Sequence, residues 1–221
     1  MILHQTRGLI RLRRTLDFVC AGMGLLLLSP LFILIAVAIM LQDGGPVFYS
    51  QWRVGRDFRL FRLHKFRSMA PDADRSGQLL TAPHDRRLTR IGRLLRRYKL
   101  DELPQLINVL RGDMQLVGSR PEVERYVRMF PVEYAEILRD RPGITDPASV
   151  VFRHEDRLLS AAEIEREYVE RILPAKLKLS LDYARCRTIT SDLMVIFATL
   201  FGSALLPGLR GRYKPAYSIE D

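Results

Sequence analysis

The feature that most constrains this fold is an uncharged stretch of 24 residues at positions 18–41. It reads FVCAGMGLLLLSPLFILIAVAIML, which is long enough to cross a bilayer and too apolar for the surface helix of a water-soluble domain. A cleaved signal peptide would be shorter and would be followed by small residues at a cleavage site, and neither condition is met here. The sequence therefore predicts an N-terminal membrane element.

Two details favour a membrane element that enters the bilayer and turns back over one that spans it. Ser29 and Pro30 lie at the midpoint, where the proline removes a helical hydrogen bond and the adjacent hydroxyl can satisfy the freed backbone group. Both flanks are rich in arginine and lysine, and such flanks stay in the cytoplasm. We therefore expect a basic lead over residues 1–16 and a re-entrant helix over 17–42, broken at Ser29-Pro30.

The charge balance narrows the class of partner. The 221 residues carry a net charge of +10, which favours nucleic acid, anionic lipid or a phosphorylated substrate. Aromatic and basic residues alternate over 48–69, a pattern that suits both a lipid headgroup layer and a nucleic-acid surface, and the neighbouring membrane element favours lipid. Cys20 and Cys186 are far apart and form no CxxC, so neither a disulfide framework nor a zinc site is indicated.

The remainder predicts an α-rich domain over 43–206 and a loosely ordered tail over 207–221. Alternating apolar residues on either side of Gly55 predict a hairpin, and a second apolar run near the end, too short to span, is expected in the core or at the membrane interface. The expected fold class is mostly α with a small β component (α/β-type): a re-entrant membrane helix plus a cytosolic catalytic domain with interfacial amphipathic helices.

A pair of adjacent carboxylates, Asp101 and Glu102, stands out within the basic domain. Leucines at helical spacing follow the pair up to Gly112, so Asp101 is expected at a helix N-cap with Pro104 in the first turn. Taken alone, these features fit a capped helix with solvated charges. The common nucleotide-binding and hydrolase motifs are missing, and the four histidines show no ligand spacing.

Such a pair in a basic, membrane-seated domain suits phosphoryl transfer. One carboxylate can attack phosphorus, and the second can hold a divalent cation that neutralises the phosphate oxygens. Lysine and arginine side chains can then bind the remaining negative charge. A membrane-embedded partner implies that one substrate is a lipid.

The motifs, taken in order, resemble the bacterial sugar transferases, the monotopic phosphoglycosyl transferases that act on polyprenyl phosphate. The resemblance covers nearly the whole chain. It rests on the basic lead and apolar helix with Ser29-Pro30, and on the following blocks: Gly45-Pro46-Val47-Phe48, Gln51 with Arg53-Val54-Gly55, Lys65-Phe66-Arg67-Ser68-Met69, Leu100-Asp101-Glu102-Leu103-Pro104-Gln105, Asn108-Val109-Leu110-Arg111-Gly112-Asp113-Met114, Val117-Gly118, Arg120-Pro121 and Arg141-Pro142-Gly143-Ile144-Thr145.

The resemblance implies a two-step transfer. Asp101 would attack the sugar-linked phosphate of a nucleotide diphosphate sugar, expected to be a UDP-sugar, with release of UMP, and polyprenyl phosphate would then accept the phosphosugar. Glu102 would bind Mg²⁺. The resemblance also implies a monotopic protein of the bacterial inner (cytoplasmic) membrane with its active site on the cytoplasmic face, membrane lipid but no nucleic acid as a partner, and a possible homodimer. The substrate-binding residues would be Lys65, Arg67, Arg96, Arg120 and Arg153.

Two departures from the family pattern fall near the site. Ser119 replaces the usual proline before Arg120, and Asp146-Pro147-Ala148-Ser149 replaces a frequent Gly-x-Ala-Gln sequence near the expected nucleotide or sugar. Two other functions remain open at this stage: a membrane-anchored polyanion-binding module, which would leave the Asp-Glu pair without a role, and a lipid diphosphate hydrolase with water as the acceptor.

Overall fold

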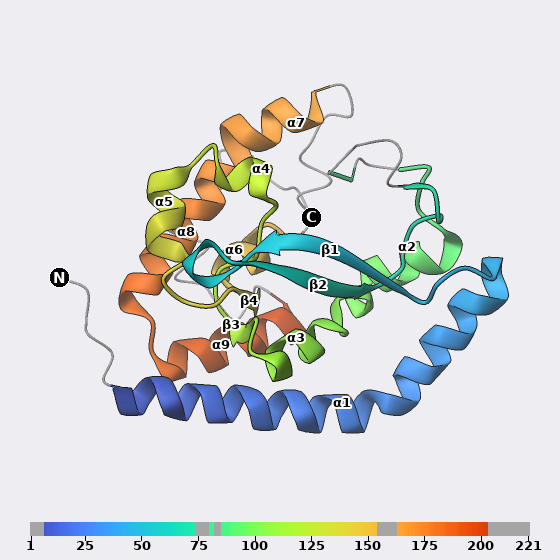
Figure 1. Cartoon of the computed structure of the whole chain (residues 1–221), viewed down its shortest axis with the longest axis horizontal. Coiled ribbons are helices and arrows are strands. Elements are labelled where there is room, and N and C mark those ends of the chain that lie inside the picture. The colour runs from blue at the N-terminus through green and yellow to red at the C-terminus, as the bar shows by residue number, and fades with distance from the viewer. Residues whose placement is uncertain (1–6, 74–79, 82–84, 154–162, 203–221) are drawn as a thin grey trace.

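The computed structural model describes residues 7–73, 80–81, 85–153 and 163–202, so the expected tail over 207–221 lies outside it. Within these ranges the chain is mostly helical with two small sheets, as the sequence predicts (Figure 1). The strands are β1 (Phe48–Val54), β2 (Leu60–Phe66), β3 (Gln115–Val117) and β4 (Gly143–Thr145). The helices are α1 (Arg7–Asp43), α2 (Arg90–Arg97), α3 (Gln105–Arg111), α4 (Glu124–Val127), α5 (Pro131–Ile137), α6 (Pro147–Val151), α7 (Ile164–Glu167), α8 (Leu173–Cys186) and α9 (Ile189–Phe201).

The apolar stretch forms one bent helix rather than two pieces. Helix α1 runs through Pro30 without interruption and changes direction beyond its middle, so that its last part rises towards β1 (Figure 1). Pro30 cannot donate to the carbonyl of Leu26, and the Ser29 hydroxyl donates to that oxygen instead, at 2.8 Å. The expected break at Ser29-Pro30 is therefore a bend with its backbone acceptor satisfied.

Both arms of α1 attach to the same domain. In the first arm, which includes part of the expected basic lead, Arg14 donates to the carbonyl of Val109 at 3.0 Å, and Ala21 is fully buried. In the second arm Ile35 and Ile39 pack in a cluster with Phe66. The domain therefore holds α1 on both sides of its bend.

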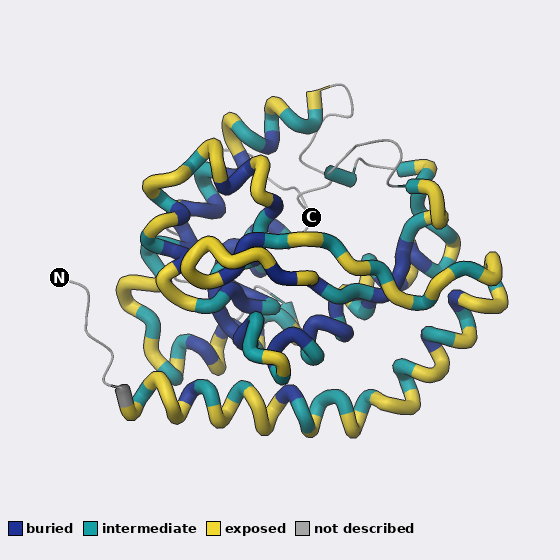
Figure 2. The backbone as a smooth tube through the Cα atoms, in the orientation of Figure 1, coloured by how far each residue is buried: buried dark blue, intermediate teal, exposed yellow. Residues whose placement is uncertain are grey.

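The outer side of α1 is apolar and open. Only 11% of its most apolar 18-residue window is buried in the structure, and much of α1 is exposed along its length (Figure 2). Leu26 and Leu27 are each 75% exposed. Leaving this much apolar surface in water is costly, so α1 suits the interior of a bilayer. Helix α9 repeats the pattern on a smaller scale, with Val195 and Ala198 buried and Leu200 and Phe201 exposed. The second apolar run therefore supplies both core and an apolar surface.

Two strand pairs place the segments that carry the site. Strands β1 and β2 form the expected antiparallel hairpin, which turns through Asp57 and Phe58 at positive φ. Strands β3 and β4 pair in parallel, and Gly118, just after β3, lies directly against Gly143 at the start of β4. A Cβ on Gly143 would come within 2.1 Å of the Gly118 nitrogen. This close approach fixes the start of the segment that leads to Arg120.

Candidate active site

The two carboxylates lie in a single 3₁₀ turn, Leu100–Glu102, between α2 and α3. Lys99 precedes it in the left-handed conformation (φ 58°), which ends the α2 region and reverses the chain. Both side chains are buried, Asp101 at 4% and Glu102 at 9% exposure. The turn places two acids in a location where neither can be a solvated surface charge.

Glu102 is held by two cations from other elements. Arg120 donates through both terminal nitrogens, Nη1 to Oε2 at 2.9 Å and Nη2 to Oε1, and Lys65 Nζ at the end of β2 donates to Oε1 at 3.0 Å. Burial opposes ionisation of Glu102, but Arg120 and Lys65 outweigh it and hold its pKa well below the usual range. Glu102 is therefore a fixed anion at neutral pH.

Asp101 has the opposite environment. Its Oδ1 is buried and has no hydrogen-bond partner among the described residues. Burial raises the pKa of Asp101 and the neighbouring Glu102 adds to the effect, while Lys65 and Arg96 act against it. The expectation that Asp101 caps a helix is wrong, since α3 begins only at Gln105 and has Pro104 before it. Instead, the carboxylate is buried with its Oδ1 unpartnered.

Arg96 and Lys65 complete the positive surroundings. Arg96 is held by hydroxyls, donating to Ser68 Oγ at 2.9 Å and Thr81 Oγ1 at 2.6 Å, and its charge favours the ionised form of Asp101. Lys65 is half-buried beside Glu102; desolvation lowers its pKa and Glu102 opposes that change. Three of the expected cations, Lys65, Arg96 and Arg120, therefore act on the carboxylate pair.

The other two expected cations contact different parts of the fold. Arg67 donates to the carbonyl of Pro46 at 2.6 Å and forms an ion pair with Asp43 at the end of α1. Arg153 donates to the carbonyl of Thr199 in α9 at 3.1 Å. The structure thus ties Arg67 to the membrane helix and Arg153 to α9, and shows neither on the carboxylate pair.

Some residues to which the sequence analysis gave no role of their own also build the site. Asn108 is fully buried, donates to the carbonyl of Arg62 at 2.7 Å and accepts from the backbone of His64 at 3.0 Å, so it fastens α3 to the strand that carries Lys65. Arg53 and Glu122 form an ion pair at 2.6 Å although they are 69 positions apart. Asn108 and Arg53 lie in motif blocks, but their contacts follow from the tertiary fold.

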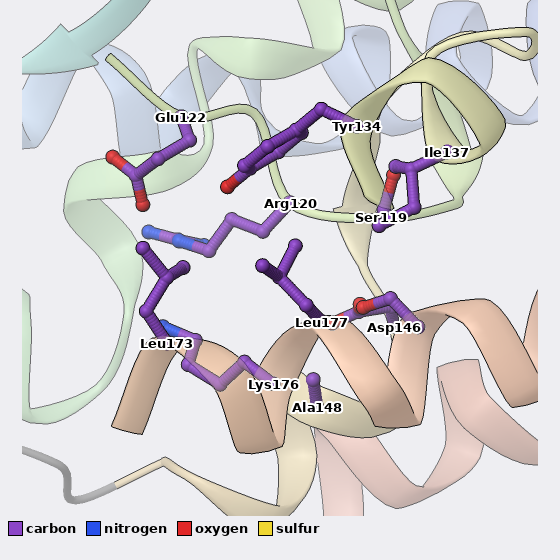
Figure 3. Close-up of a pocket in the computed structure, with 11 residues that line it drawn as sticks. Ser119, Arg120, Glu122, Tyr134, Ile137, Asp146, Ala148, Leu173, Lys176 and Leu177 are labelled. Carbon is purple, nitrogen blue, oxygen red and sulfur yellow. The ribbon is translucent and has the colours of Figure 1, made fainter. Parts of the chain in front are cut away.

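The departure at Asp146 has a structural role. Its carboxylate is 1% exposed and accepts from the Ser149 nitrogen at 2.7 Å, which caps α6, and from the Ser180 hydroxyl at 2.6 Å. It lines a cavity of about 20 Å³ behind Arg120, shown in Figure 3. This volume has room for one water molecule, so the cavity is part of the packing around Arg120 and is far too small for a nucleotide sugar.

Fold and site together define a class of protein. A buried acid with an unpartnered oxygen, a second acid held by cations and an adjoining bent apolar helix describe a membrane-associated enzyme with a buried carboxylate pair.

Comparison with known proteins then gives the family: residues 9–204 match the bacterial sugar transferases, and the chain belongs to that family. A UDP-N-acetylgalactosamine-undecaprenyl-phosphate N-acetylgalactosaminephosphotransferase from Aeromonas hydrophila is 35% identical over 194 residues, 86% of this chain and 43% of that protein. The exopolysaccharide production protein ExoY of Rhizobium meliloti is 32% identical over 85% of this chain and 83% of its own length. A UDP-glucose:undecaprenyl-phosphate glucose-1-phosphate transferase from Caulobacter vibrioides is 36% identical over 85% and 68%.

Proposed function

We propose that this protein transfers a sugar phosphate from a UDP-sugar to polyprenyl phosphate through a covalent intermediate on Asp101. The observation that carries the proposal is the division of the pair: Glu102 is ion-paired through both oxygens, whereas Asp101 keeps a buried, unpartnered Oδ1. Two acids whose environments shift their pKa values in opposite directions take different chemical roles. The names of the Aeromonas and Caulobacter relatives support a UDP-sugar donor and an undecaprenyl-phosphate acceptor.

The reaction has two displacements at one phosphorus atom. A carboxylate oxygen of Asp101 attacks the phosphorus that bears the sugar, and the bond from that phosphorus to the bridging oxygen breaks, so that UMP leaves with the electron pair. A phosphate oxygen of the polyprenyl lipid then attacks the same phosphorus and breaks its bond to Asp101. The carboxylate is restored and a polyprenyl diphosphate sugar leaves.

The cations of the site lower the repulsion between an anionic nucleophile and an anionic donor. Lys65 and Arg120 already stand at the carboxylate pair, and Arg96 lies close enough to favour ionised Asp101. The phosphates of a bound donor offer new acceptors to Arg120, whose planar guanidinium can bind two oxygens at once. These charges stabilise the negative charge that spreads over the phosphoryl oxygens during transfer.

The acidic pair also fits a magnesium ion, which Glu102 would hold. The structure brings no group of three or more metal-binding side chains together among the residues it describes, but magnesium is commonly bound by one or two carboxylates, with water and substrate phosphates as its other ligands. When bound, the ion neutralises phosphate oxygens. Because Arg120 and Lys65 already occupy the oxygens of Glu102, we expect metal affinity to rise when a donor draws these cations away.

The lipid acceptor accounts for the membrane helix. Both ends of α1 are held by the catalytic domain, and basic residues flank both ends, so we place the domain and its active site on the cytoplasmic face. A polyprenyl phosphate anchored in the same leaflet then presents its phosphate at the surface on which the domain sits. The Rhizobium relative is named for exopolysaccharide production, which supports a role in building a surface glycan.

The test is UMP release from a panel of UDP-sugars by protein in nanodiscs with magnesium and polyprenyl phosphate. Asp101→Asn should abolish release, and intact-mass spectrometry should detect a phosphosugar adduct on the wild type only. Asp57→Asn is the matched control, because Asp57 lies on the exposed hairpin turn at positive φ, a conformation that asparagine tolerates.

Each negative result of this test contradicts a different part of the proposal. Release that persists in Asp101→Asn contradicts the nucleophile assignment. Release with water as the acceptor indicates a hydrolase. Salt-sensitive binding to anionic vesicles without any release indicates a polyanion-binding module.

A further inference from the structure

Arg120 sits on a short segment, residues 118–122, that is held at its first end by backbone contacts. The Gly118 nitrogen donates to the carbonyl of Thr145 and the Gly143 nitrogen donates to the carbonyl of Ser119, both at 2.9 Å. Because Gly118 and Gly143 approach so closely, a side chain at Gly143 would collide with the segment. The segment therefore leaves the β3–β4 pair along a single path.

The second end of the segment is held by a buried carboxylate. Glu122 accepts from Arg53 Nη1 at 2.6 Å and from the Tyr168 hydroxyl at 2.8 Å, and its backbone carbonyl accepts from the Val54 nitrogen at 2.9 Å. Arg53 also donates to the carbonyl of Pro121 at 3.4 Å, and its other terminal nitrogen is fixed by Gln51 at 2.7 Å. We call the set Arg53, Glu122 and Tyr168 the Glu122 clamp. The clamp joins three parts of the chain that are distant in sequence. Its carboxylate, Glu122, lies two residues after Arg120.

An ion pair at this depth is poorly explained by stability alone. The side chains of Arg53 and Glu122 are only 16% and 13% exposed, and taking two charges out of water costs about as much as their attraction returns. Buried charge pairs are best attested where they fix one geometry out of several. The geometry that this pair would fix is the direction of the Arg120 side chain, two residues before Glu122.

The surroundings of Arg120 leave it little freedom. Figure 3 shows the carboxylate of Glu122 and the guanidinium of Arg120 directed to the same side of the cavity, with Tyr134 beside them. The cavity of about 20 Å³ behind Arg120 has room for a single water molecule, so the side chain cannot fold back into it. Its guanidinium therefore points towards Glu102, to which it donates twice.

We propose that the Glu122 clamp positions Arg120 for the carboxylate pair and for a phosphate of the donor. The proposal rests on the proposed function in naming the donor phosphate. Arg53 and Glu122 are positioning residues, because neither contacts Asp101 or Glu102, and they act through Arg120. The block Gln51-x-Arg53-Val54-Gly55 thereby gains a role in the site, although it lies in a hairpin strand.

A double-mutant cycle separates positioning from a general structural role. Glu122→Gln keeps the size of the side chain and removes its charge. We expect it to weaken binding of UMP, measured by calorimetry in nanodiscs, by about tenfold in the wild-type background and less than twofold when Arg120→Ala is also present. Uridine, which lacks the phosphate, should bind all four proteins equally. Tyr168→Phe, which removes one hydrogen bond, should weaken UMP binding less and in the same background-dependent manner.

The control is Asp192→Asn, which removes another buried carboxylate that pairs with two arginines, Arg13 and Arg187, on α1 and before α9. Its effect should be the same with and without Arg120. An equal loss from Glu122→Gln in both backgrounds would overturn the proposal.

A wild type that binds neither UMP nor any UDP-sugar would count against the proposed function, and the Tm values of the same variants would then decide on the clamp. Tm shifts of Glu122→Gln and Arg120→Ala that fall short of their sum in the double variant support it, and shifts that add overturn it.

Discussion

The structure predicts that isosteric changes at two adjacent acids shift stability in opposite directions. Asp101→Asn should remove transfer activity and stabilise the fold, whereas Glu102→Gln should destabilise it. The folded state raises the pKa of Asp101 and therefore disfavours its charge, which the asparagine lacks. The folded state lowers the pKa of Glu102, because Arg120 and Lys65 outweigh its burial, and the glutamine leaves those two cations without their anion.

The magnitudes follow from burial and partners. Removing one member of a fully buried ion pair costs about 3–5 kcal/mol. Here the side chains of Arg120 and Lys65 are 28% and 22% exposed, so water offsets part of the loss and we expect about 2–3 kcal/mol for Glu102→Gln. For Asp101→Asn we expect a gain of about 1 kcal/mol, the usual size when a strained functional group is neutralised. In a chain of this length each kcal/mol shifts Tm by about 2–4 °C.

The pH dependence of these two stability changes tests the prediction more sharply than their size at a single pH. The gain from Asp101→Asn should be full above the raised pKa of Asp101 and should vanish as pH falls below 3.8, where the wild-type carboxyl is protonated in both states. The loss from Glu102→Gln should be full above pH 4.5 and should shrink as pH falls through the lowered pKa of Glu102. Thermal unfolding of the three proteins from pH 3 to 8 measures both. A Tm change of the same sign for both variants at pH 7 would refute the division of roles.

Four other outcomes follow. The transfer rate should fall with decreasing pH at a midpoint above 3.8, because the nucleophile must be ionised and the pKa of Asp101 is raised; a pH–rate profile measures this. Gly92→Ala should lower Tm by several degrees, since its Cβ would lie 1.8 Å from the carbonyl oxygen of Ser68, whereas Gly8→Ala, in open space, should not. Mn²⁺ binding followed by electron paramagnetic resonance should be weak without a UDP-sugar and stronger with one. Leu27→Lys, on the exposed side of α1, should reduce recovery of the protein in sedimented membranes.

Local patterns predicted the elements that depend on neighbouring residues. The hairpin around Gly55 follows from alternation, the end of α3 at Gly112 from a glycine that takes φ 91°, and the bend of α1 from Pro30. The predicted N-cap at Asp101 was wrong, because local propensity favours an acid at a helix start but does not tell whether tertiary contacts will bury that acid instead. Here the chain starts α3 four residues later and keeps the carboxylate buried in the site.

The sequence alone could not predict which charged residues form ion pairs with one another. Arg67 stands two positions from Lys65 in one block and was expected to bind substrate with it, but β2 ends at Phe66, so the alternation of the strand does not extend to Arg67. Lys65 meets Glu102, and Arg67 meets Asp43. The Arg53–Glu122 pair joins residues 69 positions apart, and no local pattern specifies which of the 35 lysines and arginines approaches a given acid.

The contacts of Lys65 and Arg67 explain how α1 is held in a fixed position relative to the carboxylate pair. Strand β2 ends in Lys65 and Phe66, with Arg67 next: Lys65 binds Glu102, Phe66 packs against Phe32 of α1 with ring centroids 5.0 Å apart, and Arg67 pairs with Asp43 where α1 ends. Three consecutive residues thus connect the second arm of the bent helix to Glu102, the acid beside Asp101. Since packed side chains and ion pairs resist displacement, we expect the depth of α1 in a bilayer to set the height of Asp101 above it. An acceptor whose phosphate is held at the lipid surface can then be met by a nucleophile that stays in place.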